Sequence, residues 1–169
     1  RPGVVVRQVQ MFLRDSPHTA RNLLTISSHV VHGNVGNDAI QFPLNLRGWN
    51  VDCIHTTNFS NHPGYDSFKG SKTDPEIIRS LYRGLQKIHV RYDAVIVGYI
   101  CSKAVLEIVH EILQQLAPST KIIIDPIMGD HGKLYVAEQL VGAYQDLRRP
   151  DASNLCVDRL TPHLFATEK

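Results

Sequence analysis

The sequence has no apolar run long enough to cross a membrane. Its apolar runs, such as residues 122–124, are far shorter than the roughly 18 residues that a membrane-spanning helix needs. It also has little excess of one charge, because 18 Lys and Arg residues are balanced by 16 Asp and Glu residues, which leaves a net charge of +2. We therefore expect no membrane contact and no nucleic-acid partner, since binding nucleic acid requires a basic surface.

Cysteine is scarce and does not form a pattern. Cys53, Cys101 and Cys156 are an odd number, contain no C-x-x-C pair and lie in or beside apolar runs. We predict reduced, mostly buried thiols and a cytoplasmic protein without a secretory signal. Residues 1–22 contain four Arg and one acidic residue, a composition found in organelle transit segments. We favour a poorly ordered lead here, followed by an incomplete domain over residues 23–169.

Several common site motifs are missing. There is no G-x-x-x-x-G-K-S/T phosphate loop, no G-x-G-x-x-G dinucleotide loop, no G-x-S-x-G nucleophile turn and no H-E-x-x-H zinc helix. His29 and His32 are three residues apart and His62 lies in another segment, but no carboxylate or cysteine lies at ligand spacing from them. We therefore assign no metal to these histidines.

The pattern along the chain alternates between strand-like and helix-like segments. Hydrophobic residues make up 43% and charged residues 20%, which is typical of a globular domain. Strands are predicted over 23–28, 49–57, 93–98, 121–125 and 155–160, helices over 36–47, 73–88, 102–116 and 136–147, and loops over 58–72 and 126–133. This alternation predicts an α/β fold with a mostly parallel central sheet flanked by helices on both faces.

Local signals sharpen the helices. Pro43 predicts a break or a late start in the first helix. Thr73-x-x-Glu76 is a capping box, after which the apolar face is expected to comprise Ile77, Ile78, Leu81, Leu85 and Ile88. Ser102 can cap the next helix, whose apolar face would comprise Val105, Leu106, Val109, Ile112, Leu113 and Leu116.

Polar and glycine residues gather where the predicted strands end. In open parallel sheets, ligands bind beyond the carboxyl ends of the strands. That edge would hold residues 27–29, residues 58–62, Gly98 with Tyr99, Asp125 and Thr161. Gly33-x-x-Gly36 at the start of a helix either lets backbone N–H groups approach a ligand or is only a tight turn. We expect a cleft at this edge.

Asp125 and Asp130 leave one strand end five residues apart on a glycine-bearing loop. Carboxylate oxygens suit Mg²⁺ shared with substrate phosphates, which fits a nucleotide-dependent phosphotransferase. A strand-terminal Asp that caps a turn explains the same spacing equally well.

Taken together, these segments resemble the pyridoxal kinases of the ribokinase-like superfamily. The resemblance rests on S-S-H-V-V-H-G-N-V-G-N at 27–37, N-F-S-N-H-P-G-Y at 58–65, G-Y-I at 98–100, D-P-I-M-G-D at 125–130 and G-K-L-Y-V at 132–136. It covers about residues 23–161. It implies ATP-dependent phosphorylation of the 5′-hydroxymethyl group of pyridoxal, pyridoxine or pyridoxamine, with Mg²⁺, in some cases a monovalent cation, and a homodimer.

The resemblance also implies site residues. The substrate-binding residues would be Ser28 on the pyridine ring, Val35 and Phe59 as apolar walls, and Tyr99 and Tyr135 as residues that close the pocket. Asp125 and His163 would lie on the nucleotide side, and Asp130 and Thr161 near the metal.

The chain departs from the family in three places. Pro63 replaces the threonine whose hydroxyl contacts the substrate, and His163 and Ala166 replace the Asn and Glu of the T-P-N-x-F-E segment. The G-T-G-D or G-A-G-D motif, which supplies the catalytic aspartate base, is absent, so no catalytic residue is assigned. We therefore expect an N-terminal portion of the enzyme, with the C-terminal part missing and little or no kinase activity by itself.

Three alternatives stay open from the sequence. The chain is a catalytically inactive vitamer-binding module, a related hydroxymethylpyrimidine kinase, or a truncated product whose exposed sheet edge prevents stable folding.

Overall fold

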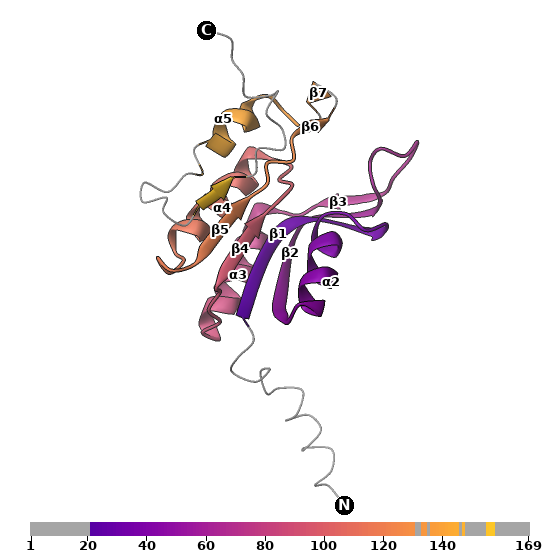
Figure 1. The fold of residues 1–169 in the computed structure, drawn as a ribbon. Helices are drawn as coiled ribbons and strands as arrows, with labels where there is room; N and C mark the ends of the chain where they lie inside the picture. The colour runs from indigo at the N-terminus through magenta and orange to yellow at the C-terminus, as the bar shows by residue number, and fades with distance from the viewer. Residues whose placement is uncertain (1–20, 131–132, 135, 146, 148–154, 158–169) are drawn as a thin grey trace, which may run out of the picture.

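The computed structural model describes residues 21–130, 133–134, 136–145, 147 and 155–157 (Figure 1). Its main sheet has the strand order β3-β2-β1-β4-β5-β8. The parallel strands are β1 (Arg21–His32), β2 (Trp49–Asn61), β4 (Ala94–Val97), β5 (Lys121–Ile124) and β8 (Leu155–Val157), and β3 (Gly70–Lys72) pairs antiparallel with β2. The mostly parallel sheet predicted from the sequence is thus confirmed.

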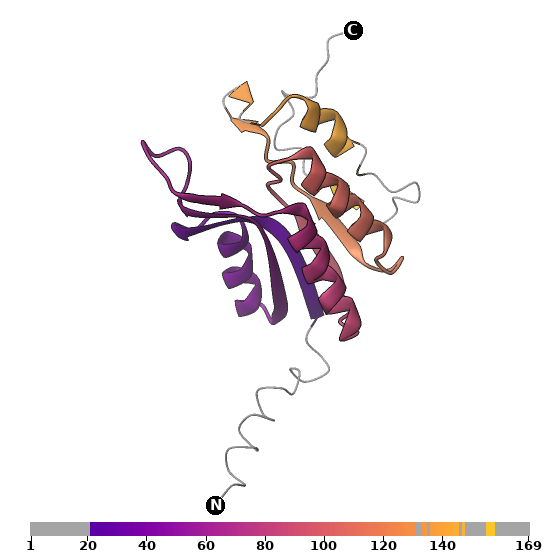
Figure 2. The ribbon, with the colours of Figure 1, turned by 180° about the vertical axis from the view of Figure 1, so that it is seen from behind.

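Helices cover both faces of this sheet, also as predicted (Figures 1 and 2). Helix α2 (Asn37–Leu46) packs on β1 and β2 over a small core that contains Leu23, Val51 and Ala94. Helices α3 (Pro75–Lys87), α4 (Lys103–Gln114) and α5 (Gln139–Gln145) lie on the opposite face. The larger core is there, because the apolar inner strands point alternate side chains such as Leu24 and Ile26 toward these helices. No described helix is long and apolar enough to span a lipid bilayer.

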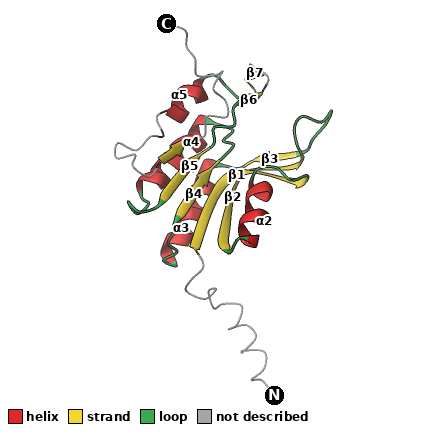
Figure 3. Ribbon diagram, viewed as in Figure 1, coloured by secondary structure: helices red, strands yellow, loops and turns green. Residues whose placement is uncertain are grey.

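Strands β1 and β2 extend far beyond the rest of the sheet. Pairing of β1 with β4 ends at Ile26 and Val97, whereas pairing with β2 shifts register between Ser27 and His29 and continues to His32. Residues 29–32 of β1, residues 58–61 of β2 and strand β3 form a projecting part that we call the outer ribbon (Figure 3). The loop predicted over 58–72 is therefore wrong at both ends, and only residues 62–69 connect the strands.

Two further sequence predictions are corrected. Helix α2 runs from Asn37 to Leu46 through Pro43, without the predicted break or late start. The predicted loop 126–133 contains a short antiparallel pair, β6 (Gly129–Asp130) with β7 (Lys133–Leu134). By contrast, the predicted Ser102 cap is confirmed, because its hydroxyl accepts the Val105 amide, and the predicted apolar face of α4 is buried.

Helix α3 begins and faces differently from the prediction. Its N-cap is Asp74, whose Oδ1 accepts the Glu76 amide at 2.8 Å, so Thr73 is not the cap. The buried side chains are Ile78 and Tyr82, whereas three residues of the predicted face are exposed: Ile77, Leu81 and Ile88. The helix is therefore rotated relative to the predicted face, because the contacts with α4 and the sheet select the Ile78 side.

The cap of α3 can be tested directly. Asp74→Ala is expected to lower the free energy of unfolding by about 1 kcal/mol, because it removes the acceptor for a helix N-terminal amide. Thr73→Ala is the matched control and should stay within about 0.5 kcal/mol of the wild type. Urea unfolding followed by circular dichroism measures both, and equal losses would contradict the assignment of Asp74.

Candidate functional site

The carboxyl ends of β1, β4 and β5 meet at one edge of the sheet. The Tyr99 amide donates to Ser27 Oγ at 3.1 Å, and the Gly98 amide donates to the Ile26 carbonyl at 3.0 Å. On the other side of β4, the Asp125 amide donates to the Val97 carbonyl at 2.8 Å. The edge predicted from the sequence is thus a set of strand ends joined by hydrogen bonds.

Glycine is required where β4 passes Ser27. A Cβ added at Gly98 would lie far inside contact distance of Ser27 Oγ and 3.0 Å from Ser27 Cβ. Because Ser27 is fully buried, its hydroxyl has no room to move away. Any side chain at position 98 would therefore push the ends of β1 and β4 apart.

The predicted glycine turn packs against Ser28. Gly36 has a φ of 56°, in the left-handed region, and a Cβ there would overlap the Ser28 carbonyl and hydroxyl. Gly36 is also the residue that caps α2, and no side chain satisfies the cap. The turn over residues 33–36 thus places Gly36 against Ser28 at the start of the helix, and Val35, directly before Gly36, is half-buried.

Two histidines lie on the α2 side of this edge. The rings of His29 and His55 are 4.5 Å apart between centroids. His29 Nδ1 is 2.9 Å from Asn58 Oδ1, and His29 Nε2 is 3.6 Å from Asp38 Oδ2. His55 Nδ1 is 2.7 Å from the side-chain nitrogen of Asn37, which can only donate, so His55 carries its proton on Nε2.

The environment of His55 disfavours its charged form. Burial lowers the pKa of His55, and the neighbouring His29 lowers it further. Asp38 acts in the opposite direction but more weakly. His55 is therefore a neutral acceptor in the folded protein near neutral pH.

The structure adds a tyrosine that sequence reasoning missed. The buried Tyr144 hydroxyl of α5 accepts the Ile100 amide and donates to the Gly98 carbonyl, each at 3.0 Å. Burial raises the pKa of Tyr144 well above its usual range, so the hydroxyl stays protonated. In the sequence, Tyr144 lies in an apolar helical segment, which indicates only a core residue. Its partner Gly98 lies 46 positions earlier, so no local pattern reveals the hydrogen bond.

The structure brings some of the predicted site residues together. Ser28, Val35 and Tyr99 are half-buried at the carboxyl edge, and Asp125 follows β5 at the same edge. Phe59 lies farther out, in the outer ribbon, where it is buried against Phe68 with ring centroids 5.0 Å apart. Asp130 lies in β6, but its side chain is outside the described part, as are residues Tyr135, Thr161, His163 and Ala166.

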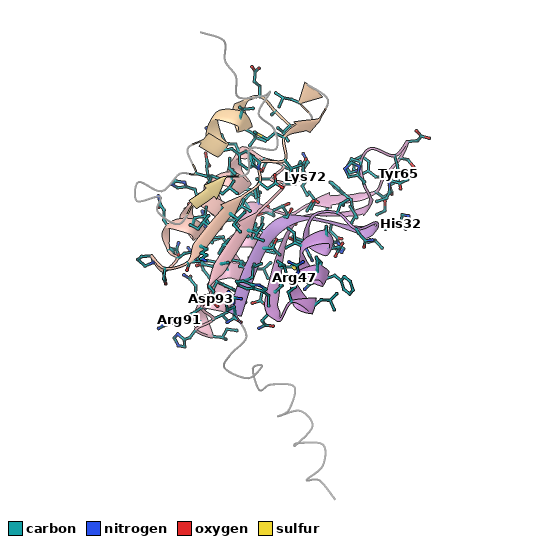
Figure 4. All side chains as sticks on the ribbon, in the orientation of Figure 1. His32, Arg47, Tyr65, Lys72, Arg91 and Asp93 are labelled. Atoms are coloured by element: carbon teal, nitrogen blue, oxygen red, sulfur yellow. The ribbon has the colours of Figure 1, made fainter. Side chains whose placement is uncertain are left out.

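The Pro63 loop closes the end of the outer ribbon. His62 Nδ1 accepts the Gly64 amide at 3.0 Å, and the His62 carbonyl accepts the Tyr65 amide at 3.2 Å. Beneath the loop is an open groove of about 390 Å³, lined by His32, Ser60, Asn61, Tyr65, Asp66 and Ser67. Figure 4 shows Tyr65 and His32 at this far end, away from Arg91 and Asp93 at the opposite edge of the sheet.

The described residues contain few side chains that could bind a metal ion together. Among residues 21–130 and the shorter described segments, no group of three or more His, Cys, Asp or Glu side chains could hold a metal ion. Asp125 is one half-buried carboxylate, and its backbone is held through the Val97 and Ile127 hydrogen bonds. One or two protein carboxylates fit Mg²⁺ when substrate phosphates complete its coordination.

Comparison with known proteins finds pyridoxal kinases both by sequence and by structure. A pyridoxal kinase of Arabidopsis thaliana is 40% identical over 157 residues, which cover 90% of this chain and 49% of that protein. A pyridoxal kinase of Leishmania donovani, solved with ADP and ginkgotoxin, superposes with a TM-score of 0.68 at 37% identity, over 75% of this chain and 47% of that one. No protein-family model matches the chain.

A more distant structure supports the fold alone. A Bacteroides thetaiotaomicron protein named as a candidate phosphomethylpyrimidine kinase superposes with a TM-score of 0.73 at 23% identity, over 79% of this chain and 47% of that one. The chain thus has the ribokinase-like fold of these neighbours. It spans about half the length of the curated relatives it matches.

Two glycine substitutions are expected to change the free energy of unfolding in opposite directions. Gly98→Ala is expected to lower the free energy of unfolding by about 1–3 kcal/mol, because the added methyl overpacks Ser27. Gly84→Ala, in the middle of α3 where a Cβ meets nothing within 4 Å, should raise it by about 0.5–1 kcal/mol. Chemical denaturation measures both, and a neutral Gly98→Ala would contradict the contact.

The histidine environment predicts a pH dependence. Because the pKa of His55 is lower in the folded state than in the unfolded chain, the unfolded chain binds the extra proton first. The contribution of His55 to stability is therefore complete above the unfolded pKa of about 6.5 and falls as the pH drops below it. His55→Gln should reduce the loss of stability between pH 7.5 and 5, measured by urea unfolding, and an unchanged pH slope would contradict it.

Proposed function

We propose that this chain, which is homologous to the pyridoxal kinases and spans about half of their length, forms the vitamer-binding side of an ATP-dependent pyridoxal kinase. The observation that carries the proposal is the roughly 40% identity to pyridoxal kinases over 90% of the chain. This similarity includes the segments that build the carboxyl edge, from the turn over residues 33–36 to Asp125. The reaction would transfer the γ-phosphate of ATP to the 5′-hydroxymethyl group of the vitamer.

The vitamer would bind at the end of β1. There the Ser28 hydroxyl would hydrogen-bond the pyridine nitrogen, and its place against the glycine turn, where a Cβ at Gly36 would overlap the hydroxyl, supports this role. Val35 and Phe59 would provide apolar walls, and Tyr99 and Tyr135 would close the pocket. Pro63 has no hydroxyl to offer the substrate, so the loop at the end of the outer ribbon would contribute shape alone.

The nucleotide would bind on the β5 side of the same edge. Asp125 would face the ATP phosphates and His163 the nucleotide, while Asp130 and Thr161 would lie near the metal. When bound, Mg²⁺ would neutralise charge on the phosphate oxygens. The aspartate base of the G-x-G-D motif is not among the 169 residues, so this chain positions the acceptor hydroxyl but offers no assigned group to remove its proton.

The other sequence-based functions have less support. A hydroxymethylpyrimidine kinase is favoured only by a structural likeness at 23% identity, which speaks for the fold. A vitamer-binding module without catalysis would have the same vitamer site as the proposed kinase and would differ from it only in having no turnover. The homodimer expected from the resemblance and the cytoplasmic location expected from the cysteines and the lack of a secretory signal stay predictions.

Binding of pyridoxine to the 169-residue chain tests the proposal. Pyridoxine is the suitable probe because, unlike pyridoxal, it has no aldehyde to form imines with lysines. Titration calorimetry should detect binding, and Ser28→Ala should weaken it by about tenfold through loss of one hydrogen bond. Ser80→Ala is the matched control, because Ser80 is an exposed serine of α3 whose hydroxyl donates to the Ile77 carbonyl.

A coupled assay for ADP release completes the experiment. We expect little or no turnover of pyridoxine and ATP by this chain, because the aspartate base is absent from it. Near-normal turnover would overturn the assignment of the missing base. Absence of pyridoxine binding, or equal affinities of Ser28→Ala and the wild type, would overturn the assignment of the vitamer site.

A further inference from the structure

A single buried amide connects the three elements that surround Ser28. Asn37, the first residue of α2, is fully buried, and its side-chain nitrogen lies 3.1 Å from the Ser27 carbonyl of β1 and 3.0 Å from the Ile54 carbonyl of β2. The same nitrogen lies 2.7 Å from His55 Nδ1. Its two hydrogens therefore serve three acceptors at the junction of β1, β2 and α2.

The orientation of this amide is set by Thr25. The buried Thr25 hydroxyl donates to Asn37 Oδ1 at 2.9 Å, and this contact turns the amide nitrogen toward the two carbonyls. A flipped amide would place its oxygen against the Ser27 and Ile54 carbonyl oxygens, which repel it. Asn37 is thus held in one orientation from both sides.

The amide acts where β1 stops pairing with β4 and shifts its register with β2. Ser27 is the last residue before the register shift of the β1–β2 ladder, and the Asn37 side chain binds its carbonyl. Gly36, directly before Asn37, has a φ of 56° and packs on the Ser28 carbonyl and hydroxyl. A fixed Asn37 therefore fixes both the backbone under Ser28 and the glycine turn that carries Val35.

We propose that Asn37 is a positioning residue that holds Ser28 and the turn over residues 33–36 in the arrangement that receives the vitamer ring, an inference that rests on the vitamer-binding function proposed above. Asn37 does not touch the vitamer and acts through Ser28, Gly36 and Val35. Its role requires an amide, because aspartate has no hydrogen for the Ser27 and Ile54 carbonyls.

Substitution of Thr25 separates positioning from stability. Thr25→Val keeps the shape of the side chain and removes only the hydroxyl that orients Asn37. Thr120→Val is the matched control, because the buried Thr120 hydroxyl donates to the Tyr92 carbonyl at 2.9 Å at the opposite edge of the sheet. Each variant loses one buried hydroxyl hydrogen bond, so similar losses of stability are expected from both.

Two measurements on these variants test the proposal. Thr25→Val should weaken pyridoxine binding by about five- to tenfold and speed amide hydrogen exchange in the peptide covering residues 33–38 by about tenfold, and Asn37→Asp should do so more strongly. Thr120→Val should change neither quantity by more than about twofold. Exchange is read without ligand, so it remains informative if pyridoxine does not bind.

The outcomes distinguish the two proposals. If the wild-type chain fails to bind pyridoxine but Thr25→Val alone speeds exchange at residues 33–38, the vitamer site is wrong and the positioning of the turn stands. If exchange there is unchanged, or if both threonine variants speed it equally, the positioning role is overturned. If exchange changes but affinity does not, Asn37 orders the turn without serving the vitamer site, and the proposal fails.

Discussion

The carboxyl edge of this sheet depends on the buried serine Ser27. Its hydroxyl accepts the backbone amide of Tyr99 from the loop after β4, and its carbonyl accepts the side-chain amide of Asn37 from the start of α2. Both elements are thereby held to one point on β1. Loss of either bond would remove one hydrogen bond of the buried Ser27, which costs about 0.5–1.5 kcal/mol, so these bonds favour one arrangement of the loops around this point.

The candidate site therefore has two parts, which differ in how firmly the rest of the fold holds them in place. The part beside Ser27 is held by buried hydrogen bonds and by a glycine that permits backbone contact. The outer ribbon consists of strand residues alone, and the loop over residues 62–69 joins β2 to β3 at its far end. Phe59 belongs to the ribbon and Ser28 to the fixed edge, so a ligand that contacts both would link a rigid surface to a projecting one.

The sheet and helix α4 were predicted well from the sequence, because an apolar pattern shows directly which strands and which helix face are buried. Residues 94–97 and 122–124 are continuous apolar runs within β4 and β5, and the apolar face of α4 is the buried one. The β2 part of the outer ribbon escaped prediction because residues 58–61 are mostly polar and only Phe59 among them is buried, a composition typical of a loop. The roles of Asn37 and Tyr144 also escaped it, because their partners are carbonyls and amides 10 to 46 positions away that no local pattern reveals.

Strand β3 has a consequence for the behaviour of the protein in concentrated solution. It is a three-residue edge strand, Gly70–Lys72, that pairs antiparallel at the end of an otherwise parallel sheet. Short length and a lysine are two of the features that keep a free strand edge from pairing with a neighbouring molecule. Strand β3 is therefore a poor template for a neighbouring strand, and this protection extends over residues 57–59 of β2, with which it pairs.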